Sequence, residues 1–115
     1  MSKGDRLGEF EQLALLAVVR LGEDAHGAAI QEELERTAGR SASISAIYIT
    51  LTRLEGKGLV ESWLGEPSEV RGGKARRHFR VRPRGLEVLH RSRQGLLRMW
   101  DGVEGALEQA GGSGV

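Results

Sequence analysis

The sequence predicts a mainly α-helical domain that contains one small β-hairpin. Two changes in the spacing of its apolar residues support this fold class. Up to about residue 56 apolar side chains recur every three or four positions, as in helices, whereas from residue 60 to 83 they alternate with polar ones, as in strands. After Pro83 the helical spacing returns and continues to about residue 110. We therefore expect helices, then a hairpin, then a long terminal helix.

The composition favours one globular domain. The chain has 115 residues, of which 39% are hydrophobic and 29% charged, and its net charge is +1. These values suit a single folded domain rather than a disordered chain. The absence of cysteine excludes disulfides and cysteine-bound zinc, and it fits a reducing compartment. The longest apolar run, residues 13–19, is too short to cross a bilayer, and the first residues form no apolar signal segment, so we expect a cytoplasmic protein without membrane contact.

Two helices are expected in the first forty residues. The first spans residues 8–20, where helical spacing relates Phe10, Leu13, Ala14, Leu16 and Ala17. The second spans residues 26–38, with Ile30 and Leu34 inward, and Gly39 follows it as a left-handed C-terminal cap. Its outer side is expected to be solvated and consists of Gln31, Glu32, Glu33 and Glu35.

A third helix is predicted after Ser43, whose hydroxyl can cap a free backbone N–H of the first turn. Gly56 and Gly58 end it. The apolar side that should face the core contains Ile44, Ile47, Leu51 and Leu54. The opposite side, placed by turning 100° per residue, contains Ser45, Ile49 and Thr52, with Ala46 and Arg53 beside them. Three consecutive helices, the third ending in glycine, resemble a helix-turn-helix arrangement.

The outer side of this third helix suits the major groove of DNA. Its small, hydroxylic and methyl-bearing groups allow close approach, Arg53 can contact guanine, and the methyl groups of Ile49 and Thr52 can touch thymine. Tyr48 lies at the shoulder of the helix, where its ring can pack and its hydroxyl can reach a phosphate. The alternative is an ordinary exposed face of low charge.

A hairpin with a basic tip follows. Residues 60–66 and 77–83 form its two strands, and Pro83 blocks further pairing. Residues 71–84 contain seven Arg or Lys and no acid. Four of these cations surround the tip glycines and can reach phosphates or a minor groove: Arg71, Lys74, Arg76 and Arg77. By itself such a run is most often a solubilising surface, but directly after a candidate recognition helix it favours nucleic-acid binding.

The last segment, residues 84–110, is expected to be one long helix. Its apolar stripe is longer than a short domain can cover, and we expect it to pair with a second copy through Leu86, Leu89, Leu96, Trp100, Val103 and Leu107. Arg93 interrupts the stripe. Trp100 is expected to anchor the dimer core, and it could instead form a wall for a flat aromatic effector.

Catalysis has little support in the sequence. The three histidines, His26, His78 and His90, lie in different elements, and none has a helical partner at the spacing of a metal site. No nucleophile elbow, phosphate-binding loop or dinucleotide fingerprint is present. We expect a protein that is not an enzyme and that has no metal site and no cofactor.

Three segments and a glycine match a known family pattern. They are LALLAVVRLGEDAHGAAIQEELE (13–35), SISAIYITLTRLEGKGLVES (43–62), GEPSEVRGGKARRHFRV (65–81) and Gly85. On these residues the sequence resembles the PadR family of bacterial transcriptional regulators. The resemblance implies a winged helix-turn-helix DNA-binding domain over residues 8–83 and a C-terminal dimerisation helix over residues 84–110. It also implies a homodimer on palindromic operator DNA, usually a repressor, which in some members releases DNA when phenolic or drug-like compounds bind.

The family pattern places the recognition helix at residues 43–57 and the wing at about residues 60–82. The matching positions are Tyr48, Leu51, Leu54, Glu55, Gly58, Leu59, Gly73, Lys74, Arg76 and Arg77. Two positions depart from it. Ile49 stands where many members have proline, which could alter the bases that the helix contacts. His78-Phe79 replaces an aromatic pair and lacks a phenolic hydroxyl.

The leading hypothesis is a dimeric winged-helix repressor that binds double-stranded DNA. Base edges would be contacted by Ser45, Ile49, Thr52 and Arg53, and phosphates or the minor groove by Arg71, Lys74, Arg76 and Arg77, with Tyr48 as a further candidate contact. One alternative is a winged-helix module that binds an acidic protein partner. Another is a regulator that senses a small aromatic effector at Trp100 in the dimer interface.

Overall fold

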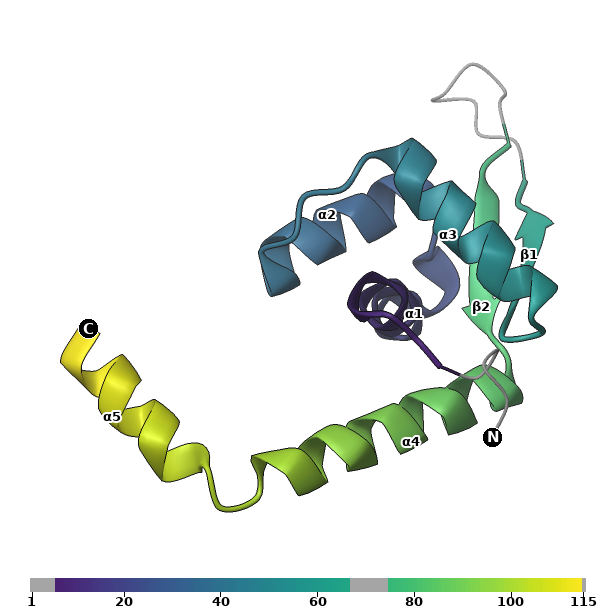
Figure 1. Cartoon of the computed structure of the whole chain (residues 1–115). Helices are drawn as coiled ribbons and strands as arrows, with labels where there is room; N and C mark the ends of the chain where they lie inside the picture. Colours follow the sequence, from purple (N-terminus) through teal and green to yellow (C-terminus); the bar gives the residue numbers. More distant parts are fainter. Residues whose placement is uncertain (1–5, 67–74, 115) are drawn as a thin grey trace.

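The computed structural model describes residues 6–66 and 75–114 (Figure 1). The elements, in chain order, are α1 (Glu9–Leu21), the 3-10 turn η2 (Gly22–Asp24), α2 (Gly27–Ala38), α3 (Ile44–Gly56), β1 (Val60–Leu64), β2 (Arg77–Val81), α4 (Pro83–Trp100) and α5 (Glu104–Gly114). Figure 1 shows α1 surrounded by α2, α3 and the hairpin, while α4 leads away from this body. The mainly helical fold with one hairpin confirms the predicted class.

The core lies between the first three helices and β2. Helices α1, α2 and α3 each bury one apolar side in it, and β2 contributes Phe79. The largest fully buried side chains include Leu15, Val18, Ile30, Ile47, Leu51, Leu54 and Phe79. Because α3 places Ile47, Leu51 and Leu54 against this core, its opposite side faces outward.

Side-chain hydrogen bonds hold the turn between α2 and α3. Gly39 ends α2 in the left-handed conformation, as expected, with a φ of 64°. The Gln31 side-chain amide donates to the carbonyl of Ala42 at 2.8 Å. The Ser43 hydroxyl then accepts from the backbone N–H of Ala46 at 3.0 Å, which confirms its role as the N-cap of α3. Both ends of the turn are therefore held, and they set the direction in which α3 begins.

The hairpin is tied to the helical body at the middle of β2 and at its base. Its antiparallel register pairs Val60 with Val81 and Ser62 with Phe79. The backbone N–H of Phe79 also donates to the carbonyl of Ala25 at 2.9 Å. At the start of α4, a Cβ added to Gly85 would lie 2.4 Å from the carbonyl oxygen of Leu59. Only glycine allows α4 to pack this closely against the base of the hairpin.

The expectation that Glu33 is a solvated residue is wrong. Its side chain is buried, with 4% of the residue exposed. Its carboxylate accepts from Arg20 Nε at 2.6 Å and from the Thr37 hydroxyl at 2.7 Å, and it also pairs with Arg36. These groups, Thr37 first and Arg20 next, hold the pKa of Glu33 at about 2, below its ordinary 4.5, against the opposing effect of burial. Glu33 therefore joins α1 to α2.

The expectation of one continuous helix over residues 84–110 is also wrong. Helix α4 ends at Trp100, residues 101–103 form a turn, and α5 begins at Glu104. Gly102 has a φ of 86°, a left-handed conformation that glycine adopts at little cost and that stops a helix. As a result Val103 lies in the turn and Leu107 in α5, and neither continues the stripe of α4. None of the helices in the described parts is long and apolar enough to cross a bilayer.

Candidate nucleic-acid interface

The outer side of α3 is open to solvent. The structure brings four of the predicted base-contacting residues to this side: Ser45, Ile49, Thr52 and Arg53. Ile49 has 60% of its surface exposed. All four lie away from the core residues of the same helix. The arrangement gives a surface of hydroxyl and methyl groups, with one guanidinium group near its C-terminal end.

This side of α3 is nearly free of negative charge. Glu55 is the one acidic residue in the helix, and it is half-buried. Its carboxylate accepts from the backbone N–H of Ser62 at 3.1 Å and from the Ser62 hydroxyl at 3.0 Å. Because the carboxylate is directed at β1, it does not add negative charge to the outer side.

Ser62 also connects α3 to the second strand of the wing. The exposed Arg77 donates from Nη1 to the Ser62 hydroxyl oxygen at 3.0 Å. The links between Glu55, Ser62 and Arg77 therefore run from the end of α3 across both strands of the hairpin. The sequence placed Glu55 only as a family-pattern position, because its partner lies beyond a turn and no local spacing relates the two.

The four predicted wing cations do not behave alike. Arg71 and Lys74 lie outside the described residues. Arg77 is exposed beside Ser62, and its predicted contact with DNA stays a prediction. Arg76 instead turns inward: its Nη1 lies 2.9 Å from Nε2 of the buried His26, and its Nε is buried without a hydrogen bond. In this structure Arg76 fastens the wing to the start of α2, and it does not project from the surface.

Tyr48 is half-buried and packs inside the helical body. Its ring lies 5.8 Å from the ring of Phe79, measured between centroids. A Cβ added to Gly27 would lie 2.9 Å from the Tyr48 hydroxyl oxygen, so the side chain also fits closely against the start of α2. Packing, the first of its two predicted roles, is thus present in the structure, and the phosphate contact stays a prediction.

Four of the residues predicted for dimerisation line an apolar groove between α1 and α4: Leu86, Leu89, Leu96 and Trp100. Leu89 is buried and the other three are exposed, as are Val103 and Leu107, which lie outside the lining. Helix α1 adds the exposed Leu16 and Val19, and the groove between α1 and α4 has a volume of about 460 Å³. A groove with this lining leaves a large apolar area in water for a chain on its own.

Comparison with known proteins agrees with the fold. The model of the transcriptional regulator PadR-like family matches residues 15–91. The chain is 35% identical over 92 residues to "Transcriptional regulator Rv3488" of Mycobacterium tuberculosis, a match that covers 80% of this chain and 81% of that protein. The match to the family covers more than half of the chain, from α1 into α4.

Solved structures with the same arrangement include a PadR family transcriptional regulator from Eggerthella lenta, at a TM-score of 0.65, 28% identity and 87% coverage of each chain. The complex structure of hsRosR-S1 matches with a TM-score of 0.66 and 20% identity over 97% of this chain and 98% of that chain, which is a likeness of fold. The matched family and the relative from M. tuberculosis are transcriptional regulators and not enzymes. The chain belongs to the PadR-like family of transcriptional regulators.

Proposed function

We propose that this chain forms a cytoplasmic homodimer that binds a palindromic operator and represses transcription. The observation that supports this best is the joined surface of α3 and the wing. The side of α3 opposite the core is exposed and poor in acid, and Glu55 and Ser62 tie the wing to the end of this helix. Such a surface can enter a major groove with the helix while the hairpin follows the neighbouring backbone.

The two parts of this surface would contact different parts of the duplex. On α3, Arg53 would bond to a guanine edge, and Ile49 and Thr52 would touch thymine methyl groups, so the helix would determine sequence preference. On the wing, Lys74 and Arg77 would bind phosphates or enter the minor groove, together with Arg71. Contacts of this second kind add affinity without choosing a sequence.

The dimer is supported by the exposed apolar side of α4. Leu96 and Trp100 line the groove between α1 and α4 and are exposed in the single chain. A second copy could fill this groove. Burial of an apolar surface contributes about 25 cal/mol per Å², so covering this groove would favour association. A two-fold pair would place two copies of α3 about one DNA turn, roughly 34 Å, apart, which requires a palindromic site.

Selection of bound fragments from the source genome tests this function. The purified chain would be mixed with sheared genomic DNA, and the retained fragments would be sequenced. We expect a two-fold symmetric motif upstream of a gene, and loss of the motif when Arg53 is replaced by alanine. Retention of fragments without a shared motif would contradict sequence-specific binding. A reporter gene behind the selected site would then show lower expression with the regulator than without it.

A small aromatic effector at Trp100 is a second candidate. The observation that favours it is that Trp100 lies in the lining of the α1–α4 groove with 43% of its surface exposed. An indole at the edge of an apolar groove can stack on a flat ligand. Aromatic compounds should then quench the fluorescence of a Trp63→Phe variant, in which Trp100 is the remaining tryptophan, and the quenching should saturate with their concentration. Quenching that rises without saturation would come from collisions and would contradict a site at Trp100.

A further inference from the structure

His26 lies between the start of α2 and the second strand of the wing. It is the N-cap residue of α2, and it forms an isolated antiparallel bridge with His78 of β2. Together with the bond from the Phe79 N–H to the carbonyl of Ala25, this bridge holds β2 against the helical body. The His26 side chain is buried, with 9% of it exposed, and it reaches beyond the bridge to Arg76.

Arg76 stands between β2 and the tip of the wing. Its carbonyl accepts from the Gly65 N–H at 2.7 Å, so the two sides of the hairpin are still bonded to each other at this point. Its Nη1 lies 2.9 Å from Nε2 of His26, and its Nε is buried. The His26 side chain therefore holds the wing at a point closer to the tip than the backbone bridge does.

The contact between Arg76 and His26 requires a neutral histidine. A guanidinium group has N–H donors and no acceptor, so Nε2 of His26 must accept, and it can accept only while it carries no proton. A proton on Nε2 would place a donor against a donor and a positive charge beside a positive charge. Proton uptake at His26 must therefore break this contact.

A carboxylate lies close enough to take the place of Arg76. Asp24 Oδ1 is 3.8 Å from the same Nε2 of His26. The Asp24 side chain is 78% exposed, so it can move toward the ring without disturbing the core. A protonated Nε2 can donate to this carboxylate, and a neutral Nε2 accepts from Arg76. The two charge states of His26 thus favour different partners on different elements.

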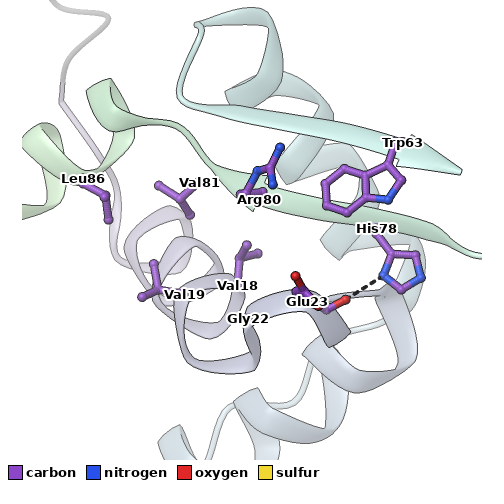
Figure 2. A pocket seen from close by; sticks show the side chains of 9 residues that line it. All are labelled: Val18, Val19, Gly22, Glu23, Trp63, His78, Arg80, Val81 and Leu86. Atoms are coloured by element: carbon purple, nitrogen blue, oxygen red, sulfur yellow. Dashed lines mark hydrogen bonds between the residues drawn. The ribbon is translucent and has the colours of Figure 1, made fainter. Parts of the chain in front are cut away.

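His78, the second titratable group beside His26, is fixed by other contacts. Its ring meets the His26 ring edge-on, with 5.7 Å between centroids. Its Nδ1 donates to the carbonyl of Glu23 at 3.1 Å, and Trp63 lies over the same ring, as Figure 2 shows. Nδ1 already carries a proton when it makes this bond, so proton uptake at His78 leaves the bond in place.

The charged groups of α2 near His26 have partners of their own. Three of them line the same hollow as His26: Glu32, Glu33 and Arg36. Arg36 pairs with Glu33 and lies 3.8 Å from Glu32, so its positive charge is balanced within α2. From α3, the Tyr48 hydroxyl packs against the start of α2 and contributes no charge near neutral pH.

We infer that His26 is a positioning residue for the wing, and that it holds the wing in place for DNA only while its ring is neutral. Proton uptake releases Arg76 and, with it, the attachment of the wing to α2. The wing cations then bind phosphates less tightly, whereas the base contacts of α3 are unchanged. Acid ordinarily strengthens the binding of a protein to DNA by adding positive charge, so the effect of His26 has the opposite sign. This consequence for DNA rests on the proposed function, whereas the release of Arg76 does not.

Two titrations from about pH 8 to about pH 5, the range in which histidine ordinarily changes charge, test the inference. NMR of the full chain without DNA follows the His26 ring and the Arg76 side chain. Fluorescence anisotropy follows the affinity for the selected operator. One variant is His26→Gln, whose amide oxygen can accept from Arg76 at every pH in this range. The other is Asp24→Asn, an exposed position, and its matched control is Glu23→Gln, because Glu23 lines the cavity beside the hairpin instead.

In the wild type we expect the Arg76 signals to change together with those of the His26 ring as the pH falls. The operator affinity should fall over the same range by about tenfold, which corresponds to about 1.4 kcal/mol. His26→Gln should remove both changes. Asp24→Asn should move them to lower pH, because the protonated ring loses its partner, and Glu23→Gln should leave them where they are.

The inference is overturned if the Arg76 signals do not follow the His26 ring, or if the affinity stays constant while Arg76 is released. It is also overturned if a folded His26→Gln variant keeps the loss of affinity in acid, or if Asp24→Asn moves the transition no more than Glu23→Gln does. The second comparison decides the matter even if His26→Gln does not fold. Release of Arg76 in a chain that binds no duplex would support the role of His26 in the free protein and would contradict the proposed function.

Discussion

The carboxylate of Glu55, near the end of α3, accepts hydrogen bonds from both the backbone N–H and the hydroxyl of Ser62 in β1. This side chain thus links the wing directly to the end of α3. The two donors approach at 3.1 and 3.0 Å, and the carboxylate is half-buried. Hydrogen bonds to a charged acceptor are stronger than neutral ones, so this link resists displacement of the wing.

Replacing Glu55 by alanine should loosen the wing and weaken DNA binding. The loss of hydrogen bonds to a charged group should lower the free energy of unfolding by about 1.5–3 kcal/mol. Affinity for the selected operator should fall while the preferred bases at the α3 contacts stay the same. Fluorescence anisotropy on operator variants measures the affinity and the base preference, and chemical denaturation measures the free energy of unfolding. Ser62→Ala keeps the backbone donor and should have a smaller effect, so an equal or larger effect would contradict the proposed link.

Replacing Arg53 by alanine should reduce sequence preference. Loss of a guanine contact should cost about 1–3 kcal/mol on the operator and should relax the preference at one base pair. Lys74→Ala is the comparison, because loss of a phosphate contact should weaken all sequences alike and reduce the slope of log affinity against log salt by about 0.9. Anisotropy titrations at several salt concentrations separate the two effects. Equal changes in specificity would rule out this division of roles.

Replacing Glu33 by glutamine should destabilise the protein in a pH-dependent way. The pKa of Glu33 is lowered to about 2 from 4.5, so its ion pairs contribute fully above about pH 4.5. That contribution is lost as the pH falls from 4.5 toward 2, because the carboxyl becomes protonated in the folded protein as well. Thermal melts of wild type and variant should therefore differ most near neutral pH and converge in acid.

The control for Glu33 is Glu32→Gln on the same helix, where the side chain is 76% exposed and lies 3.8 Å from Arg36. Exposed pairs of this kind contribute little, so the melting temperature should hardly change. A drop equal to that of Glu33→Gln would show that burial of Glu33 is not the cause.

Replacing Gly85 by alanine should destabilise the junction between the hairpin and α4. The new Cβ would meet the carbonyl oxygen of Leu59 at 2.4 Å and Val81 Cγ1 at 2.7 Å, so α4 must move. Such overpacking costs about 1–3 kcal/mol, measurable by chemical denaturation. Gly95→Ala in the same helix meets only Arg98 Nη2 at 3.9 Å and should stabilise by up to about 1 kcal/mol. The same sign for both variants would contradict this explanation.

Replacing Leu96 by glutamate should separate the dimer without unfolding the chain. Leu96 is 54% exposed in a single chain, so the charge costs little there, whereas in the proposed interface it would be buried without a partner. Light scattering should report a monomer, and circular dichroism should report wild-type helicity. Arg91→Glu, an exposed site on the opposite side of α4, should stay dimeric. A dimeric Leu96→Glu variant would place the interface elsewhere.

The helices and strands could be predicted from the sequence where local spacing determines them. Apolar periodicity located α1 to α3 to within about two residues, and the Ser43 and Gly39 caps are local signals. The break at Gly102 was missed because apolar residues continue at helical spacing across it, from Trp100 to Val103 and Leu107. A periodic pattern does not record a change in helix direction.

The errors in side-chain placement involve partners distant in the sequence. Glu33 looks like a surface residue until α1 brings Arg20 to it, and Arg76 looks like a free cation until the fold places it against His26. The outer residues of α3 were easier to predict, because the same helical geometry that buries Leu51 exposes Thr52 and Ile49. Contacts between residues that are distant in the sequence, by contrast, produce no local sequence pattern.

The most direct test is the mass of the protein–DNA complex, measured by light scattering at low ionic strength on the selected operator and on one half of it. We predict two chains on each full operator, a salt-sensitive complex, and much weaker binding to the half-site. A chain that stays monomeric and binds no duplex under these conditions would contradict the account.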